Sequence, residues 1–402
     1  MNTTRLIFAS TIASLALLSG CQTMGHGGKT GEGASIAKRR LDGLKAATEF
    51  QMAEAAYSNE DLDKALKHVS MSIQLNPDVV RSQVLLGRIH MEKGDIEKAV
   101  AAFERAETID PKAVEPNYFM GLLHERTANK EAALARFLKA SELDPTDAQY
   151  ALAAAEIMID LGQINESKSF LTERLQQFEH NAGIRQTLGH LAMMQGDPMT
   201  AVKEFADARL LSPDNQGISE DLARAYFETE QFAEAEGILS KLMDNAANKD
   251  RRDLALMQAN CLAKIDRLTE SRTILLGLTQ GSLGSRDVDA YVSLGNVCFM
   301  MKDMVRVRQA ASRLIAIAPK RHEGYLLRAL HMRHAGDFTN AEASAKQATA
   351  LGASAEAWTL LGLIQKESGQ PEAAEASFAK AAEMGADFNN NTAGAESQAD
   401  QN

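Results

Sequence analysis

The stretch GDIEKAVAAFERAETIDP, from Gly94 to Pro111, returns in altered form along the chain. Related stretches are NKEAALARFLKASELDP, which ends at Pro145, and GDPMTAVKEFADARLLSP, which ends at Pro213. The interval between Pro145 and Pro213 is twice the interval between Pro111 and Pro145. A fixed period of about 34 residues is typical of proteins built from stacked helical units, so the repeat decides the fold.

The period divides residues 46–385 into ten units. Their first residues are Ala46, Val80, Val114, Ala148, Ala182, Gln216, Arg252, Val288, His322 and Ala355. The eighth position of every unit is Gly or Ala, as in Gly87 and Gly121. Glycine inside a helix costs ~1 kcal/mol relative to alanine, so its recurrence predicts the close approach of a second helix. Position 20 is the facing small residue, and the large residues at position 24, such as Phe103 and Phe137, are expected to fill the space between units.

Prolines and glycines give an independent check on this register. Five prolines fall at position 32, where the second helix of a unit must stop, and none falls inside a proposed helix, where it would cost ~3 kcal/mol. The pairs Gly94-Asp95, Gly196-Asp197 and Gly336-Asp337 predict the turn within a unit, with the aspartate as the N-cap of the second helix.

This pattern resembles the tetratricopeptide repeat (TPR) over about residues 46–385, and units two, three, five and ten resemble it best. The resemblance implies an all-α fold, a right-handed α-solenoid of about ten helix-turn-helix repeats. Repeats 1–7 are placed at residues 46–278 and repeats 8–10 at residues 288–385. Residues 279–287, TQGSLGSRD, are predicted to be an interrupting loop that marks a hinge between two sub-arrays.

The N-terminal segment MNTTRLIFASTIASLALLSGC, which ends at Cys21, carries one basic residue and then an apolar run. The run is shorter than the ~20 residues that span a hydrocarbon core, so residues 1–20 are predicted to be a signal peptide. Leu18-Ser19-Gly20-Cys21 resembles a bacterial lipobox, which implies a diacylglyceryl thioether on Cys21. Gln22 in the following position resembles the outer-membrane sorting default, which implies a location facing the periplasm. A chance cysteine after an ordinary signal peptide is the alternative.

Both ends of the repeat array are flanked by polar sequence. Residues 21–45 begin with the Gly-rich QTMGHGGKTGEGAS and are predicted to be a flexible tether after the lipidated cysteine. Residues 386–402 are predicted to be a disordered tail. The basic run Lys38-Arg39-Arg40 is interpreted as a solvated helix start, and contact with anionic lipid is the alternative.

In the TPR family, positions 2, 5, 9, 12 and 13 of the first helices line a concave groove. In this chain those positions mix large apolar with charged and amide side chains, which suggests a protein or peptide ligand. A groove filled by the chain's own packing is the alternative. Asn260 and Asn296 share position 9 in successive units and have amides that could bond a peptide backbone. The candidate groove residues are Arg88, Met91, Tyr118, Leu122, Arg126, Met193, Met194, Arg224, Phe227, Asn260, Asn296 and Phe299.

Several function classes are disfavoured by the sequence. A net charge of −11 argues against a nucleic-acid partner. No HExxH, GxSxG, Walker A or CxxC motif is present, and His331 and His334 lack further ligands nearby in sequence. We therefore expect no enzymatic activity, no cofactor, no metal and no small-molecule substrate. Cys261 and Cys298 fall on neighbouring repeats, where buried free thiols are favoured and a disulfide stays open.

The sequence thus predicts a membrane-anchored, non-catalytic scaffold that holds a partner polypeptide in its groove. Lipoproteins of this build resemble the TPR assembly factors of type IV and Flp/Tad pili, which implies a role in pilus or secretion-system assembly. An adaptor for cell-wall (peptidoglycan) enzymes, or an accessory subunit of a periplasmic enzyme, is the alternative.

Overall fold

The structure, a computed structural model, describes residues 27–352 and 354–385, and every regular element in these ranges is helical. The predicted signal peptide, Cys21 and the predicted disordered tail (386–402) lie outside the described residues. The first helices of the ten repeats are α1 (Gly27–Ser58), α3 (Val80–Lys93), α5 (Val114–Arg126), α7 (Ala148–Asp160), α9 (Ala182–Met194), α11 (Gln216–Glu228), α13 (Arg252–Lys264), α16 (Val288–Met300), α18 (Glu323–His334) and α20 (Ala355–Glu367).

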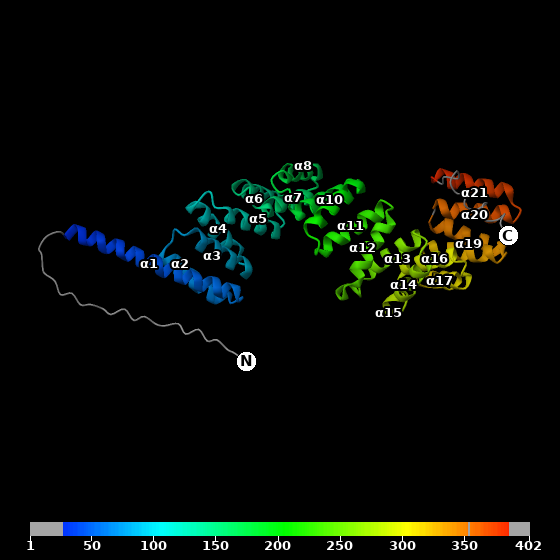
Figure 1. Cartoon of the computed structure of the whole chain (residues 1–402), viewed down its shortest axis with the longest axis horizontal. Helices are drawn as coiled ribbons and strands as arrows, with labels where there is room; N and C mark the ends of the chain where they lie inside the picture. Colours follow the sequence, from blue (N-terminus) through cyan, green and yellow to red (C-terminus); the bar gives the residue numbers. More distant parts are fainter. Residues whose placement is uncertain (1–26, 353, 386–402) are drawn as a thin grey trace, which may run out of the picture. The chain divides into compact units, whose positions relative to one another are not determined.

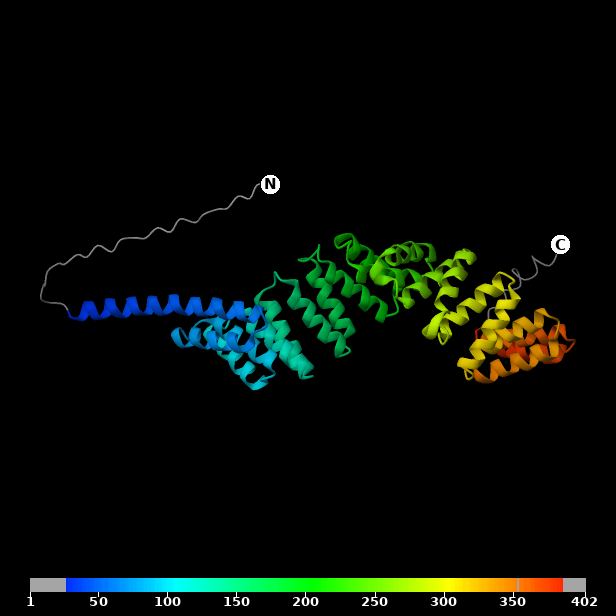
Figure 2. The same cartoon turned by 90° about the horizontal axis from the view of Figure 1, so that it is seen from below.

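Each first helix is followed by a partner that folds back on it. The second helices are α2 (Leu62–Leu75), α4 (Ile96–Ile109), α6 (Lys130–Leu143), α8 (Ile164–Leu175), α10 (Pro198–Leu211), α12 (Phe232–Asp244), α14 (Leu268–Leu278), α17 (Met304–Ile317), α19 (Phe338–Leu351) and α21 (Pro371–Glu383). Figures 1 and 2 show α3 beside α4 and α20 beside α21 as such hairpins. Two short elements, η1 (Ala246–Asn248) and α15 (Gly281–Gly284), lie in connections.

The repeat register from the sequence is confirmed by the helix boundaries. Eight of the first helices begin at the predicted residue, and α18 begins at Glu323, one residue after the predicted His322. The exception is repeat 1, whose first helix begins well before Ala46. The all-α fold built from about ten stacked helical hairpins, an α-solenoid architecture, is therefore confirmed.

The predicted flexible tether is wrong for residues 27–45. They belong to α1, which runs without a break from Gly27 into the first repeat. Once a helix is nucleated, each added residue contributes one hydrogen bond, so the hairpin of repeat 1 can extend its helix backwards through the good helix formers between Ala37 and Leu41.

The hinge predicted at residues 279–287 stays a prediction, and these residues form the connection between α14 and α16. The chain divides into two compact units, Met1–Ile157 and Met158–Asn402, and this boundary falls within α7. The connection at 279–287 belongs to the second unit. Arg252 of repeat 7 donates to the Leu278 carbonyl just before it at 2.6 Å, and Arg313 of repeat 8 donates to the Ser285 carbonyl within it at 2.8 Å.

The cores of the array are shared between neighbouring repeats. One buried cluster joins Phe50, Ala53 and Val69 of repeat 1 to Leu85 and Ile89 of repeat 2. The next cluster is built in the same way from both helices of repeat 2 and the first helix of repeat 3, and two clusters further along each join two repeats and the first helix of a third. A hairpin therefore completes its core only when a neighbour stacks on it.

A glycine and a phenylalanine sixteen residues apart hold the two helices of a hairpin together. In repeats 2, 3, 5 and 10 the ring at position 24 lies directly over the glycine at position 8. A Cβ added at Gly121 would stand 2.5 Å from Phe137 Cε1, and Gly189 and Gly362 face Phe205 and Phe378 in the same way. The prediction that position 24 fills the space between units is thus incomplete, since the ring first fills the space within its own hairpin.

Repeats 1, 6, 7 and 8 adjust this volume in another way, whereas repeat 9 has alanine at both positions, Ala329 and Ala345. Repeats 1, 6 and 7 combine an alanine with a smaller aliphatic residue, namely Ala53 with Val69, Ala223 with Leu239 and Ala259 with Leu275. In repeat 8 position 24 is only Ala311, and the space over Gly295 is taken by Leu327 from repeat 9. Close packing of the interior explains why the two positions vary together.

All ten hairpins turn through the same backbone conformation at position 15. Glycine holds it in five repeats, with φ between 72° and 80°, at Gly94, Gly162, Gly196, Gly336 and Gly369. Other residues hold it in the remaining five, with φ between 58° and 62°, at Glu60, Ala128, Glu230, Asp266 and Lys302. In each case the next N–H bonds back to the carbonyl of position 11, as Asn129 does to His124 at 2.8 Å, which satisfies the helix end.

The predicted aspartate caps are confirmed in two of three hairpins. Asp197 and Asp337 accept from the backbone N–H groups of Thr200 and Asn340. Asp95 is an exception, because its carboxylate lies 3.2 Å from His90 Nδ1 and accepts from Lys98 Nζ at 3.2 Å instead of capping α4. A competing side-chain partner therefore displaces the cap.

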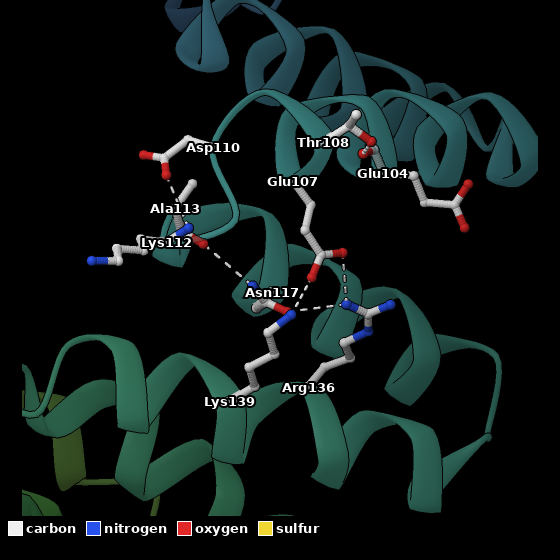
Figure 3. Close-up of polar contacts among 9 residues, drawn as sticks. All are labelled: Glu104, Glu107, Thr108, Asp110, Lys112, Ala113, Asn117, Arg136 and Lys139. Carbon is white, nitrogen blue, oxygen red and sulfur yellow. Dashed lines mark hydrogen bonds and ion pairs between the residues drawn. The ribbon is translucent and has the colours of Figure 1, made fainter.

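Polar contacts fasten repeat 2 to repeat 3 beside the apolar core (Figure 3). Glu107 of α4 accepts from Arg136 at 3.1 Å and from Lys139, both on α6, and Arg136 also donates to the buried Asn117 of α5 at 3.0 Å. Burial opposes the ionised form of Glu107, but the hydrogen bonds from Lys139 and Arg136 prevail and hold its pKa below the usual value. The pair therefore stabilises the fold at neutral pH, and this contribution is lost as the pH falls through the lowered pKa.

The volume rule at positions 8 and 24 predicts a specific coupling. Gly121→Ala should destabilise the protein by about 1–2 kcal/mol, because overpacking of roughly 1–3 kcal/mol exceeds the ~1 kcal/mol gain in helix propensity. Combining it with Phe137→Leu should recover most of the loss, since alanine with leucine is the pair used by repeats 6 and 7. Urea unfolding followed by circular dichroism measures both variants and Phe137→Leu alone, and strictly additive effects would refute the rule.

The shared turn predicts a stabilising substitution. Ala128→Gly should raise the free energy of unfolding by about 0.5–1 kcal/mol. The left-handed conformation costs a non-glycine residue roughly 1–2 kcal/mol, and the larger chain entropy of glycine in the unfolded state offsets part of the gain from removing that cost. The matched control is Ala135→Gly at an exposed position within α6, which should lose about 1 kcal/mol. Equal losses in the two variants would show that the turn carries no strain.

Candidate interaction groove

The twelve predicted groove residues all lie on first helices, and none of them is fully buried. Five belong to the first compact unit, on α3 and α5, and seven belong to the second, on α9, α11, α13 and α16. They therefore form two groups, each of which is described within its own unit.

In the first unit, Arg88 is held between two aromatic rings. Its guanidinium lies 4.8 Å from the centre of the Tyr57 ring and 5.0 Å from that of Phe119, and its Nε is buried without a hydrogen-bond partner. Arg81 lies over Phe50 at 4.7 Å, with the same separation along the sequence as Arg88 and Tyr57. Stacking of this kind orients the cation without neutralising it, so Arg88 keeps its charge for a partner.

Other predicted residues of the first group contact one another across repeats. Arg126 of α5 donates to the carbonyl of Met91, in the last turn of α3, at 3.1 Å. The Tyr118 ring packs against Phe119, Phe137 and Tyr150, with centres 5.3–5.8 Å apart, and its hydroxyl accepts from Gln149 at 2.6 Å. This part of the surface is partly occupied by the chain's own side chains, which was the alternative left open by the sequence.

In the second unit the surface is more open. Met194, at the end of α9, is 60% exposed, and Met193 beside it is half-buried. Phe227 packs edge to face with Phe232 at 5.4 Å.

The same surface carries a negative charge on α11. Asp221 accepts from Gln186 at 2.7 Å and lies 2.9 Å from His190 Nε2. Burial opposes the charge on Asp221, but these two partners and the nearby Arg224 hold its pKa below the usual value. An anionic point thus lies among the apolar residues.

A pocket open to solvent lies between the first helices of repeats 8, 9 and 10. Its volume is about 320 Å³. Asn296 and Val292 of α16, Leu326 and Leu330 of α18 and Leu360 of α20 line it. Asn296 is exposed in this pocket, so its amide can both donate to and accept from a bound chain. The pocket is the size of a few side chains, which suits an anchor residue of a peptide.

Position 6 of the repeat was missed by sequence reasoning. Phe119, Asp221 and Leu360 all occupy it, and they stack on Arg88, bind His190 and line the pocket, respectively. The constant spacing between partners on neighbouring repeats, as in Arg88 with Phe119 and His190 with Asp221, is the signal that could have found them.

Cys261 and Cys298, the two cysteines among the described residues, are buried and free. Burial raises the pKa of the Cys261 thiol to about 12, and the nearby Glu236 carboxylate acts in the same direction. Burial also raises the pKa of Cys298. Thiols of this kind are poor nucleophiles and behave as small apolar core residues.

Metal binding and membrane spanning are two properties for which the described residues give no candidate. Within them, no three His, Cys, Asp or Glu side chains are placed to share a metal ion, His331 and His334 included. None of the described helices combines the length and the apolar character that spanning a bilayer requires.

Stacked helical hairpins that share their cores define the chain as an α-solenoid repeat protein, a class that presents extended concave surfaces to other macromolecules. More particularly, it is a tetratricopeptide repeat protein. Family models described as tetratricopeptide repeat match residues 50–114, 192–261 and 355–387. No curated protein sequence matches the chain significantly.

Among solved structures, the chain is similar to PilW, a widely conserved type IV pilus biogenesis factor, at 18% identity over 50% of this chain and 93% of PilW, with a TM-score of 0.43. It is also similar to Pseudomonas aeruginosa PilF at 13% identity over 62% of this chain and 96% of PilF, with a TM-score of 0.39. A tetratricopeptide repeat protein from Parabacteroides merdae matches at 18% identity over 63% and 98%, with a TM-score of 0.44.

The state of the cysteines leads to a direct prediction. The chain from Gln22 onward has two thiols, and neither should react with Ellman's reagent at pH 8 in the native state, because almost none of the buried thiol is ionised. Both should react in 6 M guanidinium. A disulfide would give no reaction under either condition, and a rapid native reaction would show that the cysteine sites are open to solvent.

Proposed function

We propose that the chain is a lipid-anchored, non-catalytic scaffold of the bacterial cell envelope that binds a partner polypeptide on its first helices. The main support for this proposal is that large apolar side chains stay accessible to solvent beside fixed polar groups on the first helices of the repeats. Met194, Phe227 and Phe299 supply apolar area, while Arg224 and Asn296 supply charge and amide groups. Such a mixture suits an extended or helical peptide better than a small molecule.

The anchor is proposed from the lipobox at Leu18–Cys21. Lipid at Cys21 would hold the repeats at the membrane and raise the local concentration of whatever they bind. The order of signal peptide, lipobox and TPR array resembles that of pilus-assembly lipoproteins, so we propose assembly of a pilus or secretion system as the pathway, at the outer membrane facing the periplasm. An adaptor for cell-wall enzymes would use the same surface, and the identity of the bound partner separates the two.

The groove is tested by photo-crosslinking and then by affinity. A photoreactive residue at Phe227 or Phe299 should capture one envelope protein, whereas one at the exposed Leu210 should not. Met193→Asp, Met194→Asp and Phe227→Asp together should then weaken binding of the purified partner by at least 100-fold, because three anchors become charged. Unchanged affinity would refute the groove.

The matched control places the same three charges elsewhere. Leu210→Asp, Leu283→Asp and Val305→Asp alter exposed apolar positions of the same compact unit and should leave the affinity unchanged. Met194→Asp alone, at a side chain 60% exposed, gives a variant that keeps the core intact if the triple variant unfolds. Its expected effect is a loss of about tenfold.

A further inference from the structure

The first part of α1, residues 32–45, is a helix without a neighbour. Packing of α1 in the repeat core begins at Ala46 and continues through Phe50 and Ala53. Before that point nearly every residue is exposed, including the large apolar side chains Ile36 (46%), Leu41 (51%) and Leu44 (69%). Elsewhere in repeats 1 and 2 every leucine and isoleucine is at least half-buried, although the methionines Met52 (44%) and Met71 (39%) are also exposed.

Nothing within the described chain accounts for the composition of this segment. Gly33 and Gly43 weaken a helix relative to alanine, yet a Cβ at either position would meet nothing within 4 Å. A free helix of this length is marginal in water even with good helix formers. The segment is therefore one that a second surface would stabilise.

Its side chains are distributed by type around the helix. At about 100° per residue, Ile36, Leu41 and Leu44 fall within a sector about 140° wide. Arg40 lies inside that sector, Lys38 and Lys45 lie next to its Leu41 edge, and Arg39 and the acidic Glu32 lie next to its Ile36 edge. Asp42 lies on the opposite side. Apolar and basic side chains thus share one side of the helix, where long basic side chains can extend to a polar layer.

The charge of the segment is opposite to that of the protein. Residues 32–45 contain four basic and two acidic side chains, a net charge of +2, whereas the whole chain carries −11. The rest of the chain therefore carries −13. A basic, apolar helix on an acidic protein complements an anionic lipid surface.

We propose that residues 32–45 of α1 bind along an anionic membrane surface, with Ile36, Leu41 and Leu44 at the acyl boundary and Arg40, Lys38 and Lys45 among the phosphates. The inference rests on the proposed function in one respect, because Cys21 precedes Glu32 by eleven residues and an acyl chain there would hold the helix within reach of the surface. Acyl chain and basic helix then act as two membrane signals. The interpretation of Lys38-Arg39-Arg40 as a merely solvated helix start gives way to this proposal.

A second copy of the chain is the competing occupant. Pairing two such helices through the apolar sector would bring Arg40 into the contact and place Lys38 and Lys45 along its edge. Like charges at these positions oppose association. The lipid surface offers the opposite charge to the same residues and is therefore the occupant we choose.

The test uses the mature chain, residues 21–402, with Cys21→Ser so that no acyl chain is attached. It should float with vesicles of phosphatidylethanolamine and phosphatidylglycerol at 3:1 and bind phosphatidylcholine vesicles far more weakly. Lys38→Gln, Arg40→Gln and Lys45→Gln together should lower the partition coefficient on the order of 100-fold, at roughly fivefold for each basic residue. Ile36→Ser, Leu41→Ser and Leu44→Ser together should lower it on a similar scale.

Two further variants serve as controls. Lys112→Gln, Lys203→Gln and Lys320→Gln remove the same charge from exposed sites elsewhere and should leave binding unchanged. Gly33→Ala with Gly43→Ala should strengthen binding, because the helix is better formed before it meets the surface.

The outcomes separate the hypotheses. Equal binding to both kinds of vesicle, or none, overturns the proposal. Dimers in sedimentation equilibrium that vanish in the Ile36/Leu41/Leu44 serine variant, without vesicle binding, would assign the face to a second copy. The lipid anchor is measured separately by palmitate labelling of the unaltered protein in cells. If the protein is not labelled, the proposed lipid anchor is refuted and the vesicle result is unaffected. If the protein is labelled but does not bind vesicles, the anchor is supported and the proposed membrane contact of residues 32–45 is refuted.

Discussion

The close approach of two helices at positions 8 and 24 is the constraint on which the structure depends. A phenylalanine ring over a glycine, as at Phe137 and Gly121, fixes both the distance between the helices and the direction in which their other side chains point. The remaining face of each hairpin is apolar and must be covered by the next, which gives cores shared across repeats. Stacking follows from this pairing, and the alignment of the first helices follows from stacking.

Much of the fold could be predicted because the repeat reports the same physical requirement ten times. A glycine at position 8 or a proline at position 32 is ambiguous once and informative when it recurs. Eight first helices accordingly begin where predicted, as at Val80 and Val288. The tether at 27–45 was mispredicted for the opposite reason. It occurs once, and its local glycine content hides the propagation of α1 through it.

The candidate groove could be predicted only in part. Positions on the repeat told which side chains face outward from the first helices, and all twelve residues remain accessible. The repeat positions could not show which of these side chains contact a neighbouring repeat. The stacking of Arg88 between Tyr57 and Phe119, for example, depends on the register of one repeat against the next. Position 6 was overlooked for the same reason. Contacts between repeats need the stacking geometry, which a single repeat does not contain.

The turns have a consequence for where the array opens. Repeats 6, 7 and 8 all use a non-glycine residue at the left-handed turn position, and none of them has the Gly–Phe pair. Repeat 5 before them and repeat 10 near the C-terminus have both a glycine turn and that pair, and repeat 9 has the glycine turn alone. Local opening of the second unit should therefore begin in the middle of its sequence, where amide hydrogens exchange soonest. Arg224, Phe227, Asn260, Asn296 and Phe299 all lie on these three hairpins, so the surface proposed for binding belongs to the most yielding part of the unit and can adjust its spacing to an incoming chain.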